Sequence, residues 1–392
     1  MPDLFNPTEE HAALRRMVRD FAEREVDPQA AEHDRAERFN KKLFGKLGDL
    51  GLLGITVPDR FGGSDMDATA AVIAHEELAS ADPGFCLAYL AHSMLFAHNL
   101  AQNGNDEQRT RLLPGACSGA LIGGMCMSEP GAGTDVLALS TTARRDGDGY
   151  RLDGAKMWIT NGAVDDHTLG DVFLVYARVK GAPRSALSMF IVERGMAGFS
   201  LGQKLRDKLG VRASPTAELV FEDCPIPAAN RVGEEGCATL HMMRNLEIER
   251  LTLAAMSLGI ARRCIEVMNR YASERRSFGQ PLRAFGQIQR HLAESFAEFQ
   301  AGRSYVYQVA NNLTLSGTGN RVDSDGVKLY CSTMAKNVAD RAIQVLGGYG
   351  YVGEYQVERL WRDAKLLEIG GGTLEAHQKN ITRDLATRSH IK

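Results

Sequence analysis

The first part of the chain, from Pro7 to about Gly115, has the hydrophobic spacing of amphipathic helices. After a Pro-Thr-Glu-Glu sequence typical of a helix start, apolar residues recur at intervals of one, three and four: Leu14, Met17, Val18, Phe21 and Ala22. Such intervals place apolar side chains on one face of a helix. The spacing resumes over residues 68–80 and 83–102, after a turn sequence at 59–63. The pattern therefore predicts an N-terminal helical region.

The middle of the chain changes from helical spacing to short apolar runs. β-branched and aromatic residues dominate 172–176 and 189–192, and residues 216–221 alternate polar with apolar side chains. Another short run, 150–154, follows a cluster of aspartate and glycine. Short runs bounded by turn residues are typical of β-strands. They predict a β domain in the middle of the chain.

Helical spacing returns after Gly236, and the segments are long. Four apolar residues are spaced by four, four and three positions: Ile288, Leu292, Phe296 and Phe299. Residues 327–346 contain neither proline nor glycine. Apolar residues on more than one face of these helices favour burial against partner subunits. We expect an N-terminal helical domain at 1–121, a middle β domain at 122–233 and a C-terminal helical bundle at 234–392.

Composition and charge exclude several classes of protein. Hydrophobic residues make up 44% of the 392 residues and charged residues 24%, which excludes a disordered or collagen-like chain. The net charge is −3 and the basic residues form no cluster, which argues against a nucleic-acid partner. No window approaches the ~20 apolar residues of a membrane span, and the N-terminus resembles no targeting signal. We expect a bacterial cytoplasmic protein, or one of the mitochondrial matrix if a presequence is missing from this chain.

Cysteine and histidine usage indicates a reducing compartment and no metal site. The seven cysteines are an odd number and include no Cys-x-x-Cys pair, so a disulfide framework is not expected. The ten histidines show no His-Glu-x-x-His or similar ligand spacing. Metal-dependent hydrolysis is therefore not the expected chemistry.

A Gly-x-Gly-x-x-Gly sequence at 348–353 would by itself suggest a dinucleotide site. The preceding segment 339–344 has the pattern of a helix, whereas this motif requires a strand. The position about 20 residues later, where an acid should bind the ribose, is Thr373. We predict that Gly347 and Gly348 end a helix at positions that need a positive φ.

Three other segments have the composition of ligand-binding loops. Residues 127–135 combine small residues with the hydroxyls of Ser128 and Thr134, which suits an anion, although a plain loop is the alternative. Residues 156–162 place Trp158 two positions before Thr160, which suits a flat heterocycle, although a tryptophan in a strand is also typical of a core. The glycines at 370–372 indicate close approach of the backbone to another group, or a hinge.

Five segments together resemble the acyl-CoA dehydrogenases, in the family's order and at its separations. They are residues 127–135, Met-Trp-Ile-Thr-Asn at 157–161, Glu-Arg-Arg-Ser-Phe-Gly-Gln at 274–280, Gln-Val-Leu-Gly-Gly-Tyr-Gly at 344–350 and Arg-Asp-Ala-Lys at 362–365. The resemblance implies an N-terminal α-helical domain, a β-barrel-like middle domain and a C-terminal four-helix bundle. It also implies FAD-dependent α,β-dehydrogenation of an acyl-CoA, transfer of electrons to electron-transfer flavoprotein, and a homotetramer.

The resemblance also assigns site residues. Ser128 and Thr160 would hydrogen-bond the flavin ring, Trp158 would lie against it, and Arg275 and Ser277 would reach the pyrophosphate of a neighbouring subunit. The implied cofactor residues are Met127, Ser128, Gly133, Thr134, Trp158, Ile159, Thr160, Arg275, Ser277, Gln344, Val345, Gly347, Gly348, Thr373 and Glu375. The implied substrate residues are Ser128, Leu246, Glu247, Arg250, Tyr271, Gly371 and Gly372. Gly286 stands where the family usually has a glutamine, and residues 164–170 form a longer loop than usual.

The catalytic base is expected at an unusual position. Most members of the family place a glutamate directly before the Gly-Thr of the last motif, but this chain has Gly371 there. A subgroup, the isovaleryl-CoA dehydrogenases, uses a glutamate within Leu-x-x-Glu-Arg-Leu, and residues 246–251 have that form. The resemblance therefore implies that Glu249 is the base, although a helical glutamate is otherwise typical of a solvated surface. Likeness to this subgroup extends to residues 91–93, 221–224 and 226–230.

The expected reaction is the oxidation of isovaleryl-CoA to 3-methylcrotonyl-CoA, a step of leucine catabolism. We expect Met94, Leu95 and Phe96 to shorten the acyl pocket and Gly371 to leave room for a branch. The alternatives are a dehydrogenase for longer or isoprenoid, citronellyl-type acyl-CoAs, an acyl-CoA oxidase, and a non-catalytic acyl-CoA or flavin-binding protein.

Overall fold

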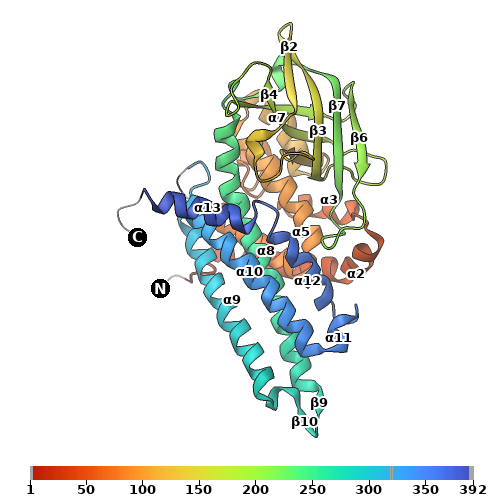
Figure 1. Cartoon of the computed structure of the whole chain (residues 1–392), viewed down its shortest axis with the longest axis vertical. Helices are drawn as coiled ribbons and strands as arrows, with labels where there is room; N and C mark the ends of the chain where they lie inside the picture. Colours follow the sequence, from red (N-terminus) through yellow and green to blue (C-terminus); the bar gives the residue numbers. More distant parts are fainter. Residues whose placement is uncertain (1–2, 318, 320, 388–392) are drawn as a thin grey trace.

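The computed structural model describes residues 3–317, 319 and 321–387, and it contains a helical, a β and a second helical region in that order. Figure 1 shows the sheet at one end of the molecule and long helices that extend toward the other end. This arrangement confirms the expected fold class. The domain boundaries at 121/122 and 233/234 stay predictions.

The N-terminal region consists of short helices that pack around two buried helices, residues 68–81 and 83–90. Its elements are α1 (Glu9–Phe21), η1 (Ala22–Val26), α2 (Asp27–Ala36), α3 (Lys41–Asp49), η2 (Asp59–Phe61), α4 (Ala68–Ala81), α5 (Pro83–Leu90), η3 (Ala91–His98), α6 (Asn99–Asn103) and α7 (Asp106–Cys117). The Thr8 side chain accepts the His11 N–H at 3.3 Å and begins α1, as the sequence predicts. The predicted helix over 83–102 is present, but its middle part, η3, has wider π-helical turns between α5 and α6.

The middle region is one eight-stranded sheet with the strand order β6-β7-β3-β2-β4-β5-β8, in which β1 also pairs with β4. Its elements are β1 (Gly123–Cys126), η4 (Val136–Ala138), β2 (Thr142–Asp146), β3 (Gly149–Thr160), β4 (Val172–Val179), β5 (Leu187–Glu193), β6 (Phe199–Lys204), β7 (Thr216–Ile226), η5 (Ala228–Asn230) and β8 (Arg231–Val232). The register of β3 with β7 shifts between Lys156 and Ile159, which is a β-bulge. Apolar clusters pack on both faces of the sheet, as expected for a sheet covered on each side.

The C-terminal region is dominated by α8, α9 and α10. Its elements are α8 (Ala238–Glu274), β9 (Arg276–Ser277), β10 (Gln280–Pro281), η6 (Leu282–Ala284), α9 (Gly286–Asn312), α10 (Arg321–Leu346), α11 (Gly348–Tyr351), α12 (Val357–Leu367) and α13 (Leu374–Leu385). In Figure 1, α8 runs from beside the sheet to the β9–β10 hairpin at the opposite end. One hydrophobic core joins α1, α3, α4 and α5 to α8, α9, α10 and α12, so the two helical regions pack as a unit.

The glycine-rich segment at 347–353 follows a helix, as predicted. Gly347 has φ +60° and ends α10, which confirms its predicted conformation. Gly348 does not have a positive φ; it begins α11, so the prediction for this glycine is wrong. Among the helices of the described residues, we find none with the length and apolar character needed to cross a bilayer.

Candidate active site

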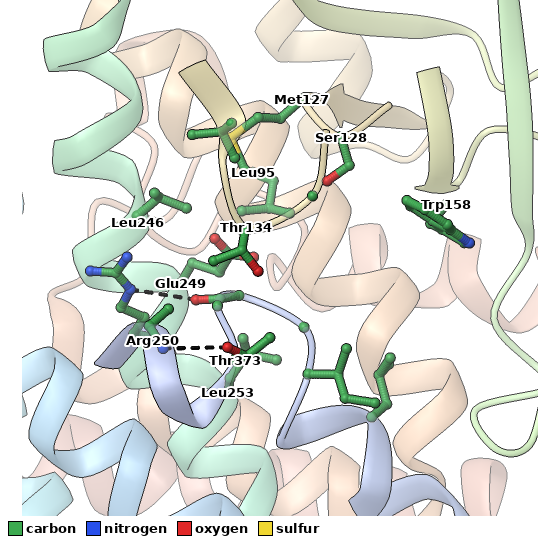
Figure 2. A pocket seen from close by; sticks show the side chains of 18 of the residues that line it. Leu95, Met127, Ser128, Thr134, Trp158, Leu246, Glu249, Arg250, Leu253 and Thr373 are labelled. Atoms are coloured by element: carbon green, nitrogen blue, oxygen red, sulfur yellow. Dashed lines mark hydrogen bonds between the residues drawn. The ribbon is translucent and has the colours of Figure 1, made fainter. Parts of the chain in front are cut away.

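A cavity of about 970 Å³ lies where the sheet meets α8, α12 and α13. Such a volume suits a cofactor together with a substrate. Figure 2 shows Leu246, Glu249, Arg250 and Leu253 on one side of this cavity and Trp158 on the other. Its lining includes residues from the three predicted ligand-binding segments, which are far apart in the sequence.

The loop after β1 contributes Met127, Ser128, Gly133 and Thr134 to the cavity wall. Buried Glu129 anchors this loop: its Oε1 accepts from Lys156 Nζ at 2.9 Å and from the Thr141 N–H at 2.9 Å. Burial by itself raises the pKa of Glu129, but Lys156 and the surrounding hydrogen-bond donors outweigh burial and lower that pKa to about 2. The charged pair therefore holds the loop in one position, and sequence reasoning did not find it.

Trp158 lies in the bulge of β3, and its exposed fraction is 55%. Its φ of +61° is strained for a residue with a side chain. The bulge turns the indole toward the cavity, beside Ile159 and Thr160. The alternative that this tryptophan belongs to the core is therefore wrong. The next residue, Asn161, donates to Ala88 O at 2.9 Å and to Gly123 O at 3.1 Å, which ties the end of β3 to α5 and β1.

Glu249 lies on α8 and its carboxylate faces the cavity. Its side chain is nearly buried, and among the described residues its Oε2 atom has no hydrogen-bond partner. Burial raises the pKa of Glu249 to about 7, against the opposing positive charges of Arg250 and Lys328. An unpaired carboxylate with this pKa in an apolar cavity can act as a general base near neutral pH.

The glycine loop, residues 370–372, closes the cavity opposite the sheet. Gly371 and Gly372 have φ of +68° and +107°, which explains why they are glycines. A Cβ atom on Gly371 would lie 2.3 Å from Leu253 Cδ1 and 3.6 Å from Glu249 Oε1. The expectation that Gly371 leaves open room is therefore wrong: Leu253 and Glu249 fill the space that a side chain at 371 would take.

The apolar side chains that line the cavity differ from the expected floor of the acyl pocket. Leu95 lines it, together with Leu87, Leu90, Ala91, Met125 and Leu246. Met94 and Phe96, which we expected to shorten the pocket, are fully buried in the core and do not line it. The π-helical turns of η3 change which side chains face inward, because they alter the rotation per residue.

The structure leaves several predicted residues outside the cavity of their own chain. These are Glu247, Tyr271, Arg275, Ser277, Gln344, Val345, Gly347, Gly348 and Glu375. Tyr271 lies 22 residues beyond Glu249 on α8, about 33 Å along the helix, so its predicted contact with the same substrate is wrong within one chain. It packs instead against Tyr355, with ring centroids 5.3 Å apart.

The other residues of this group lie outside the cavity for different reasons. Arg275, Ser277 and the segment 344–348 lie at the far end of α8 and α10, where the prediction needs a neighbouring subunit. Glu247 is buried outside the cavity, and Glu375 is exposed at the start of α13. Val345 packs in the core, so its side chain contacts neighbouring helices.

Sequence reasoning also missed residues that line the cavity. Arg362 and Lys365 belong to the Arg-Asp-Ala-Lys segment, so the signal for them was present in the sequence. Lys208, on the loop before β7, donates to Ser214 O at 2.6 Å and Val211 O at 3.0 Å. Burial lowers the pKa of Lys208 to about 8. The longer loop at 164–170 does not line the cavity; Asp166 pairs with Lys204 at 2.7 Å.

Comparison with protein families matches the whole architecture. The N-terminal domain of acyl-CoA dehydrogenases matches residues 8–120, the middle domain 124–224 and the C-terminal domain 239–386. The mitochondrial isovaleryl-CoA dehydrogenase of Oryza sativa subsp. japonica is 41% identical over 385 residues, which cover 97% of this chain and 92% of that protein. The short-chain specific acyl-CoA dehydrogenase of Clostridium acetobutylicum is 39% identical and covers 96% of this chain and 98% of its own.

Solved structures agree with the fold. Butyryl-CoA dehydrogenase from Megasphaera elsdenii has a TM-score of 0.90 at 33% identity, covering 97% of this chain and 98% of its own. A glutaryl-CoA dehydrogenase from Mycobacterium smegmatis in complex with FADH2 has a TM-score of 0.90 at 27% identity, with 98% and 96% covered.

Proposed function

Because this chain belongs to the acyl-CoA dehydrogenase family, it is an FAD-binding oxidoreductase, and we propose that its substrate is a short branched acyl-CoA, isovaleryl-CoA first. The observation that carries this proposal is the place of Glu249. It puts an unpaired, buried carboxylate in the cavity beside the glycine that replaces the family's usual base. The names of the similar isovaleryl-CoA dehydrogenases support the same assignment.

The residues present fit a bound flavin. Trp158 offers an exposed aromatic plane, and Ser128, Thr134 and Thr160 place hydroxyls along the same wall of the cavity. Bound FAD supplies the acceptor for the hydride that leaves Cβ of the substrate. The ion pair of Glu129 and Lys156 keeps the 127–135 loop ordered before any ligand arrives, which reduces the entropy cost of binding.

Proton abstraction is assigned to Glu249. Its unpaired Oε2 atom accepts the proton from Cα, and the C–H bonding electrons shift to form the Cα–Cβ double bond as the hydride leaves Cβ. Leu246 and Leu253, one turn before and after Glu249 on α8, keep water away from the carboxylate. Low water access strengthens the electrostatic effect of each fixed charge in the cavity.

The apolar end supports a short acyl chain. Leu95 closes the cavity from η3, and Leu253 fills the space beside Gly371, so the substrate's branch must lie elsewhere along the apolar wall. Steady-state turnover of a panel of acyl-CoAs, with electron-transfer flavoprotein as the acceptor, tests this. Isovaleryl-CoA should give the highest kcat/KM, with butyryl-CoA slower, because one methylene changes binding by only about 1–3 kcal/mol. A higher value for octanoyl-CoA or citronellyl-CoA would assign the enzyme to longer acyl chains.

We further propose that the electrons pass to an electron-transfer flavoprotein, that the reaction serves leucine catabolism, and that the enzyme acts in a bacterial cytoplasm or a mitochondrial matrix. Turnover with purified electron-transfer flavoprotein should exceed turnover with oxygen alone. Faster turnover with oxygen would indicate an acyl-CoA oxidase.

A homotetramer is proposed because Arg275, Ser277 and Gln344 lie too far from their own cavity to contact its cofactor. The exposed apolar side chains near them, Phe278 at 93% and Tyr351 at 82%, suit burial against another copy. Sedimentation of the flavin-loaded protein tests this proposal. A flavin-loaded, active monomer would contradict it.

We predict that flavin reduction accelerates as pH rises through about 7, because Glu249 must be ionised to accept a proton and burial raises its pKa to about 7. Below that pH, the rate should fall about tenfold per unit, and above it the rate should level off. Stopped-flow absorbance with isovaleryl-CoA measures the profile. A rate that is unchanged across this range would argue against Glu249 as the ionising group.

Moving the base to position 371 is expected to need a second change. In Glu249→Gly with Gly371→Glu, the new side chain meets Leu253 and a backbone φ of +68°, so little activity should return. Adding Leu253→Ala removes the 2.3 Å contact and should raise the rate of flavin reduction above that of the double variant. Equal rates for the double and triple variants would show that Leu253 is not the obstacle.

A further inference from the structure

The glycine loop has no side chains over residues 370–372, so its position depends on the groups that bind its backbone. Arg250 Nε on α8 donates to Gly371 O at 3.4 Å. Gly372 O accepts from Lys328 Nζ on α10 at 3.3 Å and lies 3.0 Å from His377 Nε2 on α13. Three helices therefore hold the carbonyl oxygens of this loop through cationic or imidazole side chains.

Lys328 is the least expected of these groups, because it lies in the first third of α10 with no exposed surface. Its ammonium also makes a short hydrogen bond to Leu367 O, a carbonyl of the last turn of α12. Carbonyls at a helix C-terminus have no intrahelical partner and carry partial negative charge. Lys328 therefore joins the end of α12 to the glycine loop that follows it.

The charge of Lys328 also acts on Glu249. Burial lowers the pKa of Lys328 to about 8, while the negative charge of Glu249 opposes that fall. In turn, Lys328 is one of the two positive groups that hold the pKa of Glu249 down against burial. Lysine remains protonated below about pH 8, so the two side chains can be oppositely charged when the base is ionised.

Other charged or titratable groups surround this pair. Arg250 lies on the same helix as Glu249, Tyr176 on β4, Glu368 at the end of α12 and His377 on α13. Asp325 on α10 accepts from Arg250 at 3.0 Å, which partly offsets the charge of Arg250, and it lies 2.6 Å from His377 Nδ1, an imidazole whose pKa burial lowers. Lys328 therefore supplies a positive charge whose hydrogen bonds go to backbone carbonyls, and Glu249 is the first of the acidic groups, with Glu368 and Asp325, that interact with this charge.

We propose that Lys328 is a positioning residue for the base: its ammonium fixes the glycine loop, and its charge favours the ionised form of Glu249. The proposal rests on the assignment of Glu249 as the base. It explains why a charged side chain is retained in the core beside an active-site loop, although burying it is costly. One side chain, Lys328, thereby affects both the position of the glycine loop and the protonation state of Glu249.

Infrared titration of Glu249 in the flavin-loaded protein tests the electrostatic part without turnover. The band of the protonated carboxylic acid is assigned by its loss in Glu249→Gln. In Lys328→Met, which keeps the length of the side chain and removes its charge, this band should persist to a pH about one unit higher. Lys336→Met, on the same helix and partly buried, should leave the titration unchanged. An unchanged titration in a folded Lys328→Met protein overturns the proposal.

Hydrogen exchange tests the positioning part. Amides of residues 367–376 should exchange about tenfold faster in Lys328→Met than in Lys336→Met, because a charged hydrogen bond to the loop is lost. If Lys328→Met does not fold, Lys328→Gln replaces it in both measurements. If Lys328→Met and Lys336→Met exchange and titrate equally, the proposal is overturned. Neither measurement requires oxidation of an acyl-CoA, so failure of this proposal can be distinguished from failure of the proposed function.

Discussion

Replacing Glu249 with glutamine is expected to lower the rate of flavin reduction by isovaleryl-CoA by about 10²–10⁴-fold, which is the usual contribution of a positioned general base. The side chain keeps its size and its place on α8, so flavin content and acyl-CoA binding should be preserved. The loss should therefore appear in the reduction rate and not in the concentration of acyl-CoA needed for half-maximal reduction.

Anaerobic stopped-flow absorbance of the flavin measures this loss, and equilibrium titration with a non-reducing acyl-CoA analogue measures binding. Glu266→Gln is a matched control, because Glu266 lies on the same helix with its side chain 57% exposed. It should reduce the flavin at the rate of the unchanged protein. A Glu249→Gln protein that does the same would rule out this residue as the base.

Removing Glu77 is expected to destabilise the fold by about 3–5 kcal/mol, since this buried carboxylate is shared by three arginines. Its oxygens lie 2.7 Å from Arg15, 3.0 Å from Arg19 and 2.7 Å from Arg262, while its own side chain is 1% exposed. The cluster joins α1 and α4 to α8. In Glu77→Ala, the three arginines lose the carboxylate that they share, and Glu76, 2.9 Å from Arg15 and 4.0 Å from Arg262, is left to balance the buried positive charge. Leaving buried charge poorly balanced costs more than the original pairs contribute.

Thermal unfolding of the flavin-loaded protein measures this effect, and the midpoint should fall by more than about 5 °C. Glu25→Gln removes an ion pair with Lys46 in which both side chains are more than 40% exposed, so it should cost less than about 1 kcal/mol. A fall no larger than that of Glu25→Gln would contradict the prediction.

The ion-pair cluster around Glu77 predicts that the fold loses stability at low pH. Burial alone would raise the pKa of Glu77, but Arg262 and the other arginines outweigh burial and hold that pKa well below its usual range. A carboxyl with a lowered pKa stabilises the fold above its unfolded-state pKa and loses this contribution as pH falls toward the folded value. The difference in stability between the unchanged protein and Glu77→Ala should therefore shrink below about pH 4.

Local patterns were sufficient for the order of the elements. The spacing of apolar residues indicates which face of a segment is buried, and that is enough to separate helical regions from the sheet. Glu249 was implied by the resemblance to the acyl-CoA dehydrogenases, through the glycine at 371 and the form of residues 246–251; the chain's own pattern would have left it a surface glutamate. The ligand-binding segments around Ser128, Trp158 and Thr373 were found from their local composition, and the structure brings them to one cavity.

Only the tertiary structure determines which residues pack against each buried face. Leu253 fills the space beside Gly371, and Lys328 reaches Gly372 O, yet neither contact leaves a local pattern, because the partners lie 118 and 44 residues apart. The π-helical turns of η3 turned Met94 and Phe96 away from the cavity, and the bulge in β3 exposed Trp158. A prediction from periodicity assumes a constant rotation per residue, so it fails where a bulge or a wider turn changes that rotation. It also carries no information about which element packs against the buried face.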